Sequence, residues 1–128
     1  MAEPYRVLDL TDHRGQVAAP LLNTLGAEVV LVEPPAGTDT RFMGPFAGDS
    51  PHAERSLLFT AWNRGKRSVT LDLATAPGSA TLADLAARAD VLIESGAVPI
   101  DLEGLRRANP SLVTISISAF GGTGPKAT

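Results

Sequence analysis

The stretch RVLDLTDHRGQVAAPLLNTLGAEVVLV, residues 6–32, decides the fold. Two short runs dominated by Val and Leu, at 6–10 and 27–32, are predicted as strands, and apolar residues at helical spacing lie between them. Gly26 follows the helical segment, at the position where glycine commonly ends a helix. A strand, a helix and a second buried strand in this order predict a β–α–β unit with parallel strands.

The same alternation of apolar runs and helical patterns continues along the chain. The predicted strands are 6–10, 27–32, 68–71, 91–93 and 112–118. The predicted helices are 15–25, one or two turns at 57–62, a segment that Pro77 opens and Ala89–Asp90 ends, and 102–108. Residues 34–56 are rich in Pro, Gly and Asp and are predicted as an irregular loop. The sequence therefore predicts one α/β domain over residues 1–128, a Rossmann-like open parallel sheet with helices on both faces.

Composition narrows the classes of function. The formal net charge is −3 and the basic residues form no long stripe, so a nucleic-acid-binding surface is not expected. No apolar run approaches the roughly 18 residues that cross a bilayer, and the N-terminus lacks the basic and apolar regions of a secretory signal. The absence of cysteine excludes disulfides, thiolate metal sites and a cysteine nucleophile. We expect a soluble, cytoplasmic protein that binds neither nucleic acid nor a membrane.

Ligands of open α/β sheets bind outside the carboxyl ends of the strands. The segment 11–16, after the first predicted strand, lacks the G-x-G-x-x-G pattern that lets a backbone approach a pyrophosphate. Glu33, at the end of the second strand, is therefore only a weak signal for a dinucleotide. His13 has a pKa suited to a general base, but a lone histidine in a turn is more often a helix-entrance residue. No spacing of His, Asp and Glu resembles a metal site, and no metal is expected.

A basic run precedes the third predicted strand. Arg64, Lys66 and Arg67, with Arg41 upstream, could hold phosphates, because guanidinium groups offer forked donors and Gly65 lets the backbone come close. The competing interpretation is a solvated run of charges, and the residues alone favour it.

Several segments follow one another in an order that is typical of a known family. They are Arg6–Thr11, Leu21–Leu22, Leu25–Val30, Val32–Pro35, Asn63–Leu73, Ala89–Glu94, Asn109–Pro110 and Ser116–Pro125. In these segments the chain resembles the N-terminal portion of family III (CaiB/BaiF-type) acyl-CoA transferases. The resemblance covers nearly the whole chain, and Asn63–Leu73 is its most recognisable part.

The resemblance implies an enzyme that moves CoA between carboxylic acids. An aspartate attacks an acyl-CoA thioester, and a mixed anhydride then gives an aspartyl-CoA thioester. A minority branch of the family racemises 2-methylacyl-CoA instead. Both branches bind CoA as substrate or ligand, use no other cofactor, and form intertwined dimers. The CoA-binding residues that the resemblance favours in this chain are Gln16, Arg41, Arg64, Lys66 and Arg67.

The chain also departs from the family pattern. The catalytic aspartate lies beyond the Gly-Pro that corresponds to Gly124-Pro125, so no residue here inherits the nucleophile, and the chain is not expected to be active alone. The family's Asn-Phe-x-Pro-Gly loop is replaced by residues 95–100, and the usual lysine after Leu-Asp-Leu is Ala74. The chain is therefore expected to be part of a transferase, with a homodimer or a complementary C-terminal segment or chain as its partner. The second interpretation is a non-catalytic degenerate domain that supports folding or oligomerisation of a partner or fused domain. A racemase and, last, a dinucleotide-binding domain are the remaining alternatives.

Overall fold

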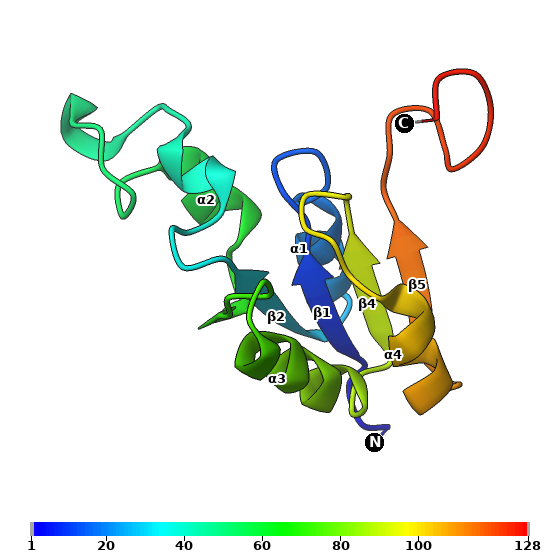
Figure 1. The fold of residues 1–128 in the computed structure, drawn as a ribbon. Helices are drawn as coiled ribbons and strands as arrows, with labels where there is room; N and C mark the ends of the chain where they lie inside the picture. Colours follow the sequence, from blue (N-terminus) through cyan, green and yellow to red (C-terminus); the bar gives the residue numbers. More distant parts are fainter. Residues whose placement is uncertain (1, 128) are drawn as a thin grey trace.

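The computed structural model describes residues 2–127, which form one five-stranded sheet in which all strands are parallel (Figure 1). The strand order is β3-β2-β1-β4-β5. The strands are β1 (Arg6–Leu10), β2 (Glu28–Glu33), β3 (Arg67–Thr70), β4 (Val91–Glu94) and β5 (Val113–Ser116). This arrangement confirms the predicted Rossmann-like α/β class.

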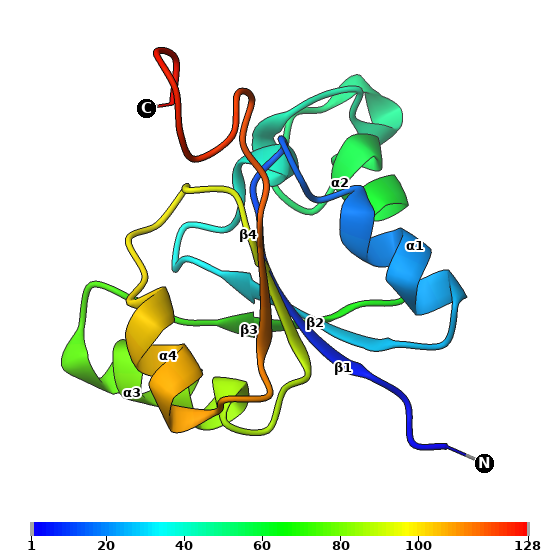
Figure 2. The ribbon, with the colours of Figure 1, turned by 90° about the vertical axis from the view of Figure 1, so that its right-hand side faces the viewer.

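Helices cover the two faces of the sheet unequally. The helices are α1 (Ala18–Thr24), α2 (Leu57–Trp62), α3 (Ala76–Ala86) and α4 (Leu102–Ala108). Figure 2 shows α3 and α4 on one side of the sheet, here called the α3 face, and α1 on the other, the α1 face. The larger apolar core lies under α3 and α4, and its fully buried members include Leu8, Leu82 and Leu92. A smaller core of Val7, Ala19, Val29 and Ile93 lies under α1.

Side-chain caps begin three of the helices. Ser56 accepts a hydrogen bond from the Phe59 N–H at the start of α2, Thr75 does so for α3 and Asp101 for α4. Each cap satisfies an N–H group that has no partner within its own helix, which stabilises the chain by about 1 kcal/mol per cap. The caps fix where the helices begin, and the observed bounds of α2 and α4 agree with the sequence prediction.

The long segment between β2 and α2 is more ordered than an open loop. It contains two 3-10 helices, Asp39–Phe42 and Ala47–Asp49, and Phe46 pairs with Ser56 in an isolated β-bridge. The Ser56 hydroxyl, which is almost fully buried, lies 2.8 and 2.7 Å from the carbonyl oxygens of Thr40 and Met43, which share its single proton. The predicted irregular loop is therefore held together by its own polar contacts.

The first helix begins later than predicted. The N–H groups of Gly15 and Gln16 both bond to the Asp12 carbonyl, so these residues form a turn, and α1 starts at Ala18. The last strand, β5, is also shorter than the predicted 112–118. Within residues 2–127, no helix has the length and apolar character needed to cross a membrane.

Candidate functional site

The carboxyl ends of the strands meet at one edge of the sheet, where the order of connections reverses between β1 and β4. Ligands of such sheets bind at this reversal. Asp12, in the turn after β1, is bonded to Ser95, which directly follows β4. Its carboxylate accepts from the Ser95 hydroxyl at 2.9 Å, and its N–H donates to the Ser95 oxygen at 3.0 Å. Asp12 also holds Arg14 through both carboxylate oxygens. Partial burial alone would raise the pKa of Asp12, but these hydrogen bonds, chiefly from Arg14, hold that pKa below its usual value.

Lys66 is buried at this end of the sheet. Its ammonium lies 2.5 Å from an Asp9 carboxylate oxygen, 3.0 Å from the Gln16 carbonyl and 2.8 Å from the Asn63 side-chain oxygen. The side chains of Lys66 and Asp9 are 1% and 0% exposed. Burial lowers the pKa of Lys66, and the charge of Asp9 opposes that shift. An ammonium group has three hydrogens, so all of the donors of Lys66 are used inside the protein.

Gln16 extends the same network. Its amide nitrogen donates to the Thr11 carbonyl and to the Thr38 hydroxyl, at 3.1 and 2.9 Å. Its amide oxygen accepts from Thr40 at 2.5 Å and from Asn63 at 2.9 Å. Gln16 is fully buried, so it links the turn after β1, the segment after β2 and the end of α2 without facing solvent.

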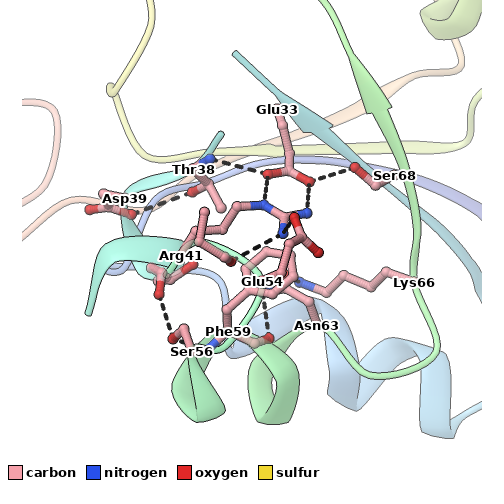
Figure 3. Close-up of polar contacts among 12 residues, drawn as sticks. Glu33, Thr38, Asp39, Arg41, Glu54, Ser56, Phe59, Asn63, Lys66 and Ser68 are labelled. Atoms are coloured by element: carbon pink, nitrogen blue, oxygen red, sulfur yellow. Dashed lines mark hydrogen bonds and ion pairs between the residues drawn. The ribbon is translucent and has the colours of Figure 1, made fainter. Parts of the chain in front are cut away.

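Arg41 and Glu33 form a second buried pair (Figure 3). Arg41 donates to both Glu33 oxygens, at 2.6 and 2.8 Å, and its guanidinium lies 3.8 Å from the centre of the Phe59 ring. Ser68 and the Thr38 N–H also donate to Glu33. Burial alone would raise the pKa of Glu33, but these hydrogen bonds hold it below its usual value. In dinucleotide-binding folds a carboxylate at this position accepts hydrogen bonds from the ribose hydroxyls. Both oxygens of Glu33 already accept hydrogen bonds from Arg41, so the arrangement does not favour that use.

The remaining basic residues of the run lie elsewhere. Arg64 is exposed, and its carbonyl accepts a hydrogen bond from Asn23 of α1. Arg67 lines a hollow with Leu85 of α3 and with Arg88, which follows that helix, so its side chain is on the α3 face. Lys66 faces Gln16 instead, because successive side chains of an extended chain point to opposite faces. The structure brings Lys66 and Gln16 together, places Arg41 in the neighbouring pair, and leaves Arg64 and Arg67 apart from both.

His13 lies beside the segment after β2. Its Nδ1 is 2.5 Å from an Asp39 carboxylate oxygen, and both side chains are close to half-exposed. Ligand-type atoms of Asp12, His13 and Asp39 lie within 4.8 Å of one another, a grouping that the sequence did not suggest. Each of the three side chains already has a protein partner in hydrogen-bond contact.

Two hollows open at the carboxyl ends of the strands. The larger, about 520 Å³, lies beyond β4 and β5 and has Arg14, Ser95, Ser118, Gly122 and Lys126 among its lining residues. The smaller, about 120 Å³, lies beyond β1, β2 and β3, and its lining includes Pro34, Leu71, Ala74 and Val98. Two of the positions that depart from the family pattern, Ala74 and Val98, therefore face one hollow.

A sequence model described as CoA-transferase family III matches residues 3–128. The chain belongs to CoA-transferase family III. This assignment confirms the resemblance that the order of its segments indicated.

Curated relatives of this family III chain are named as CoA-transferases. The subunit BbsE of succinyl-CoA:(R)-benzylsuccinate CoA-transferase from Thauera aromatica is 36% identical, over 96% of this chain and 32% of the relative. Succinate–glutarate CoA-transferase from Agrobacterium fabrum is 41% identical, over 88% of this chain and 30% of the relative. The crystal structure of a CAIB/BAIF family protein from Brucella suis superposes with a TM-score of 0.85 at 38% identity, covering 96% of this chain and 34% of that one. The chain thus spans about a third of the length of the relatives that it matches.

The sequence did not identify the larger hollow of this family III domain. Arg14 and Lys126 lie near opposite ends of the chain, and no spacing rule connects them. The available signal was the rule that ligands bind at the carboxyl ends of strands, which pointed to the segments after β4 and β5 but not to particular side chains.

Proposed function

We propose that this chain is the CoA-binding or acyl-CoA-binding portion of an enzyme that moves CoA between carboxylic acids. The observation that carries the proposal is the family III match over residues 3–128, together with relatives whose names describe transfer of CoA between acids. The covalent chemistry belongs to an aspartate supplied from outside the residues of this chain.

The reaction proposed for the complete enzyme is acyl transfer through that aspartate. A carboxylate oxygen attacks the thioester carbonyl carbon, the C–S bond breaks, and CoA leaves as a thiolate from the mixed anhydride. The thiolate then attacks the aspartyl carbonyl carbon, which releases the first acid as a carboxylate and leaves an aspartyl-CoA thioester. The second acid receives CoA by the reverse sequence.

The larger hollow suits the polar parts of CoA. It lies at the reversal of strand order, and two cationic side chains, Arg14 and Lys126, line it beside the hydroxyl group of Ser118. Arg14 is held by Asp12, and the Lys126 ammonium lies 5.4 Å from the centre of the Phe120 ring. Phosphate groups are recognised by such cations and hydroxyl donors. The smaller hollow, lined by Pro34, Leu71 and Val98, suits a planar apolar group such as the base of CoA.

The CoA-binding residues that the resemblance favoured divide into two groups under this proposal. Gln16, Lys66 and Arg41 act indirectly, because their polar atoms are bonded within the protein and shape the loops around the site. Arg64 and Arg67 are exposed and stay candidates for direct contact with a phosphate.

A non-catalytic domain that supports a partner is the second candidate. The observation that favours it is the replacement of the family's loop by residues 95–100 and of its lysine by Ala74, both around the carboxyl ends of the strands. A domain of this kind would keep the fold and lose affinity for CoA.

A thermal titration with CoA separates the two candidates. A ligand that binds only the folded state stabilises it, by about 2.7 kcal/mol at a hundredfold excess over Kd. We expect the melting temperature of the wild-type chain to rise with CoA concentration, and the rise to be smaller for Lys126→Ala. Arg107→Ala, which removes an exposed cation of α4 away from both hollows, is the matched control. A wild-type melting temperature that CoA does not change contradicts the binding proposal and favours the non-catalytic domain.

A further inference from the structure

Lys66 joins three segments at the carboxyl edge of the sheet. Its ammonium bonds to Asp9 near the end of β1, to the Gln16 carbonyl in the turn after β1, and to Asn63 at the end of α2. Figure 3 shows the Lys66 side chain directed towards Asn63. Apolar side chains of similar volume often replace a buried ion pair without loss of stability. What they do not replace are three bonds in fixed directions, which hold the three segments in one arrangement.

The backbone before Lys66 forms a tight turn. Asn63 follows the last residue of α2, and the Lys66 N–H donates to the Asn63 carbonyl at 3.2 Å. Gly65, between them, has a φ of 82°, in the left-handed region that glycine adopts without strain. A side-chain carbon at Gly65 would also collide with the side-chain amide of Asn23 in α1. The position of Lys66 is therefore fixed by its own loop as well as by its bonding partners.

The turn that Lys66 contacts, residues 11–16, is held from within by buried polar groups. Asp9 accepts from both the N–H and the hydroxyl of Thr11, at 3.0 and 2.5 Å. Every donor and acceptor of the Gln16 side chain is bonded inside the protein. Because Lys66 bonds to Asp9 and to Gln16, its ammonium ties both ends of the turn to one point.

Arg14 lies on the outer side of the same turn. Its N–H and its guanidinium both donate to Asp12, and Asp12 bonds to Ser95 after β4. The Asp12 carbonyl accepts from the N–H groups of Gly15 and Gln16. The direction of the Arg14 guanidinium therefore depends on the path of the turn, because Arg14 and the carboxylate that holds it both belong to that turn.

We propose that Lys66 is a positioning residue for CoA binding: its buried ammonium holds residues 11–16 in the conformation that directs Arg14 towards a phosphate. The inference rests on the proposed function, in which Arg14 is one of the cations that meet CoA. Lys66 itself does not touch the ligand, because its side chain is 1% exposed and its three donors are used. Without the ammonium the turn populates other conformations, and the apparent affinity for CoA falls by the fraction that stays competent.

The affinity of the 128-residue chain for CoA, measured by isothermal titration calorimetry, tests the proposal. Lys66→Met removes the ammonium and keeps an unbranched side chain, and we expect it to raise the Kd for CoA at least about tenfold. Leu112→Ala, which opens a cavity in the larger core at the amino end of β5, is the control for lost stability. At a temperature where each protein is folded, this control should keep the wild-type Kd.

A chemical rescue separates the ammonium from other effects of the substitution. The chain contains no cysteine, so Lys66→Cys introduces a single thiol. Alkylation of the thiolate with bromoethylamine in denaturant forms a C–S bond, releases bromide and restores an amine on a side chain as long as that of lysine. After refolding, the alkylated variant should regain most of the CoA affinity that the unalkylated variant lacks. A folded, alkylated variant that binds no better than the unalkylated one contradicts the proposal.

Hydrogen exchange shows whether the effect arises in the turn. In Lys66→Met the N–H groups of Gly15 and Gln16 should exchange at least about tenfold faster than in the wild-type chain, through local opening. Leu112→Ala should leave these rates unaltered. If Lys66→Met does not fold, the double variant Asp9→Asn with Lys66→Met, which leaves no unpaired carboxylate, takes its place with the same expected results.

The outcomes distinguish this inference from the proposed function. A wild-type chain that does not bind CoA removes the proposed function, and this inference with it. A wild-type chain that binds CoA no more tightly than Lys66→Met overturns the inference alone. The inference is also overturned if Leu112→Ala lowers the affinity as much as Lys66→Met does, because Lys66 then contributes only to stability.

Discussion

The two halves of the carboxyl edge of the sheet differ in how their polar groups are used. On the side of β1, β2 and β3, Lys66 and Arg41 are buried against Asp9 and Glu33. On the side of β4 and β5, an open hollow is lined by polar groups, and Lys126 is exposed. Charged groups whose hydrogen bonds are satisfied inside the protein hold the structure together, while exposed groups at a hollow are available to a ligand. The two halves therefore predict different consequences for the same kind of substitution.

Removal of the Lys66 ammonium should produce the largest loss of stability. Lys66→Ala leaves the carboxylate of Asp9, which is fully buried, without its cation. An unpaired buried charge of this kind costs about 3–5 kcal/mol. Chemical denaturation of the purified variant measures the change in the free energy of unfolding. The double variant Asp9→Leu with Lys66→Met, which removes both charges, should be more stable than Lys66→Ala, and a double variant that is less stable would contradict this account.

Separation of Arg41 from Glu33 should have a smaller effect that depends on pH. Arg41→Met removes two charge-assisted hydrogen bonds to Glu33, while the hydrogen bonds from Ser68 and the Thr38 N–H remain. We therefore expect the free energy of unfolding to fall by about 1–3 kcal/mol at pH 7. The folded-state pKa of Glu33 lies below its usual value of 4.5. The pair's contribution is therefore fully present above that usual value and is lost as the pH falls through the folded-state pKa.

Unfolding curves recorded from pH 7 down to about pH 3 test this dependence. The difference in stability between wild type and Arg41→Met should narrow as the solution becomes more acidic. A difference that stays constant over this range would mean that Arg41 acts through packing on Phe59 rather than through the charge of Glu33.

Truncation of Lys126 should have the smallest effect on stability. Lys126 is exposed on the open side of the carboxyl edge, and surface substitutions of this kind change the free energy of unfolding by less than about 0.5 kcal/mol. Chemical denaturation of Lys126→Ala without ligand provides the measurement. A loss of more than about 1 kcal/mol would show that the open half is also held together by its charges, and the contrast with Lys66 would disappear.

The sequence predicted the fold well because its signals are local. Apolar runs such as Val91–Ile93 and the helical pattern after Pro77 lie within single elements, so their periodicity identifies them. The start of α1 was placed too early because the turn at Gly15 and Gln16 depends on the Asp12 carbonyl rather than on apolar spacing.

The candidate site was predictable only in part because its contacts join distant segments. Lys66 and Asp9 are 57 positions apart, and Asp12 and Ser95 are 83 apart. The basic run was treated as one candidate group, yet the alternation of side chains along an extended backbone sends Lys66 and Arg67 to opposite faces. Local spacing could indicate the edge of the sheet where these residues lie, but not which of their polar groups would be buried.

Lys66 and Lys126 are the only lysines of the sequence, and one is buried while the other is exposed. Reagents that acylate amines require an unprotonated nitrogen that they can reach, and in the folded chain the nitrogen of Lys66 is enclosed by Asp9, Gln16 and Asn63. Brief labelling of the native protein should therefore modify Lys126 and spare Lys66. Modification of Lys66 then reports opening of the folded chain, so mass spectrometry of the labelled protein follows unfolding.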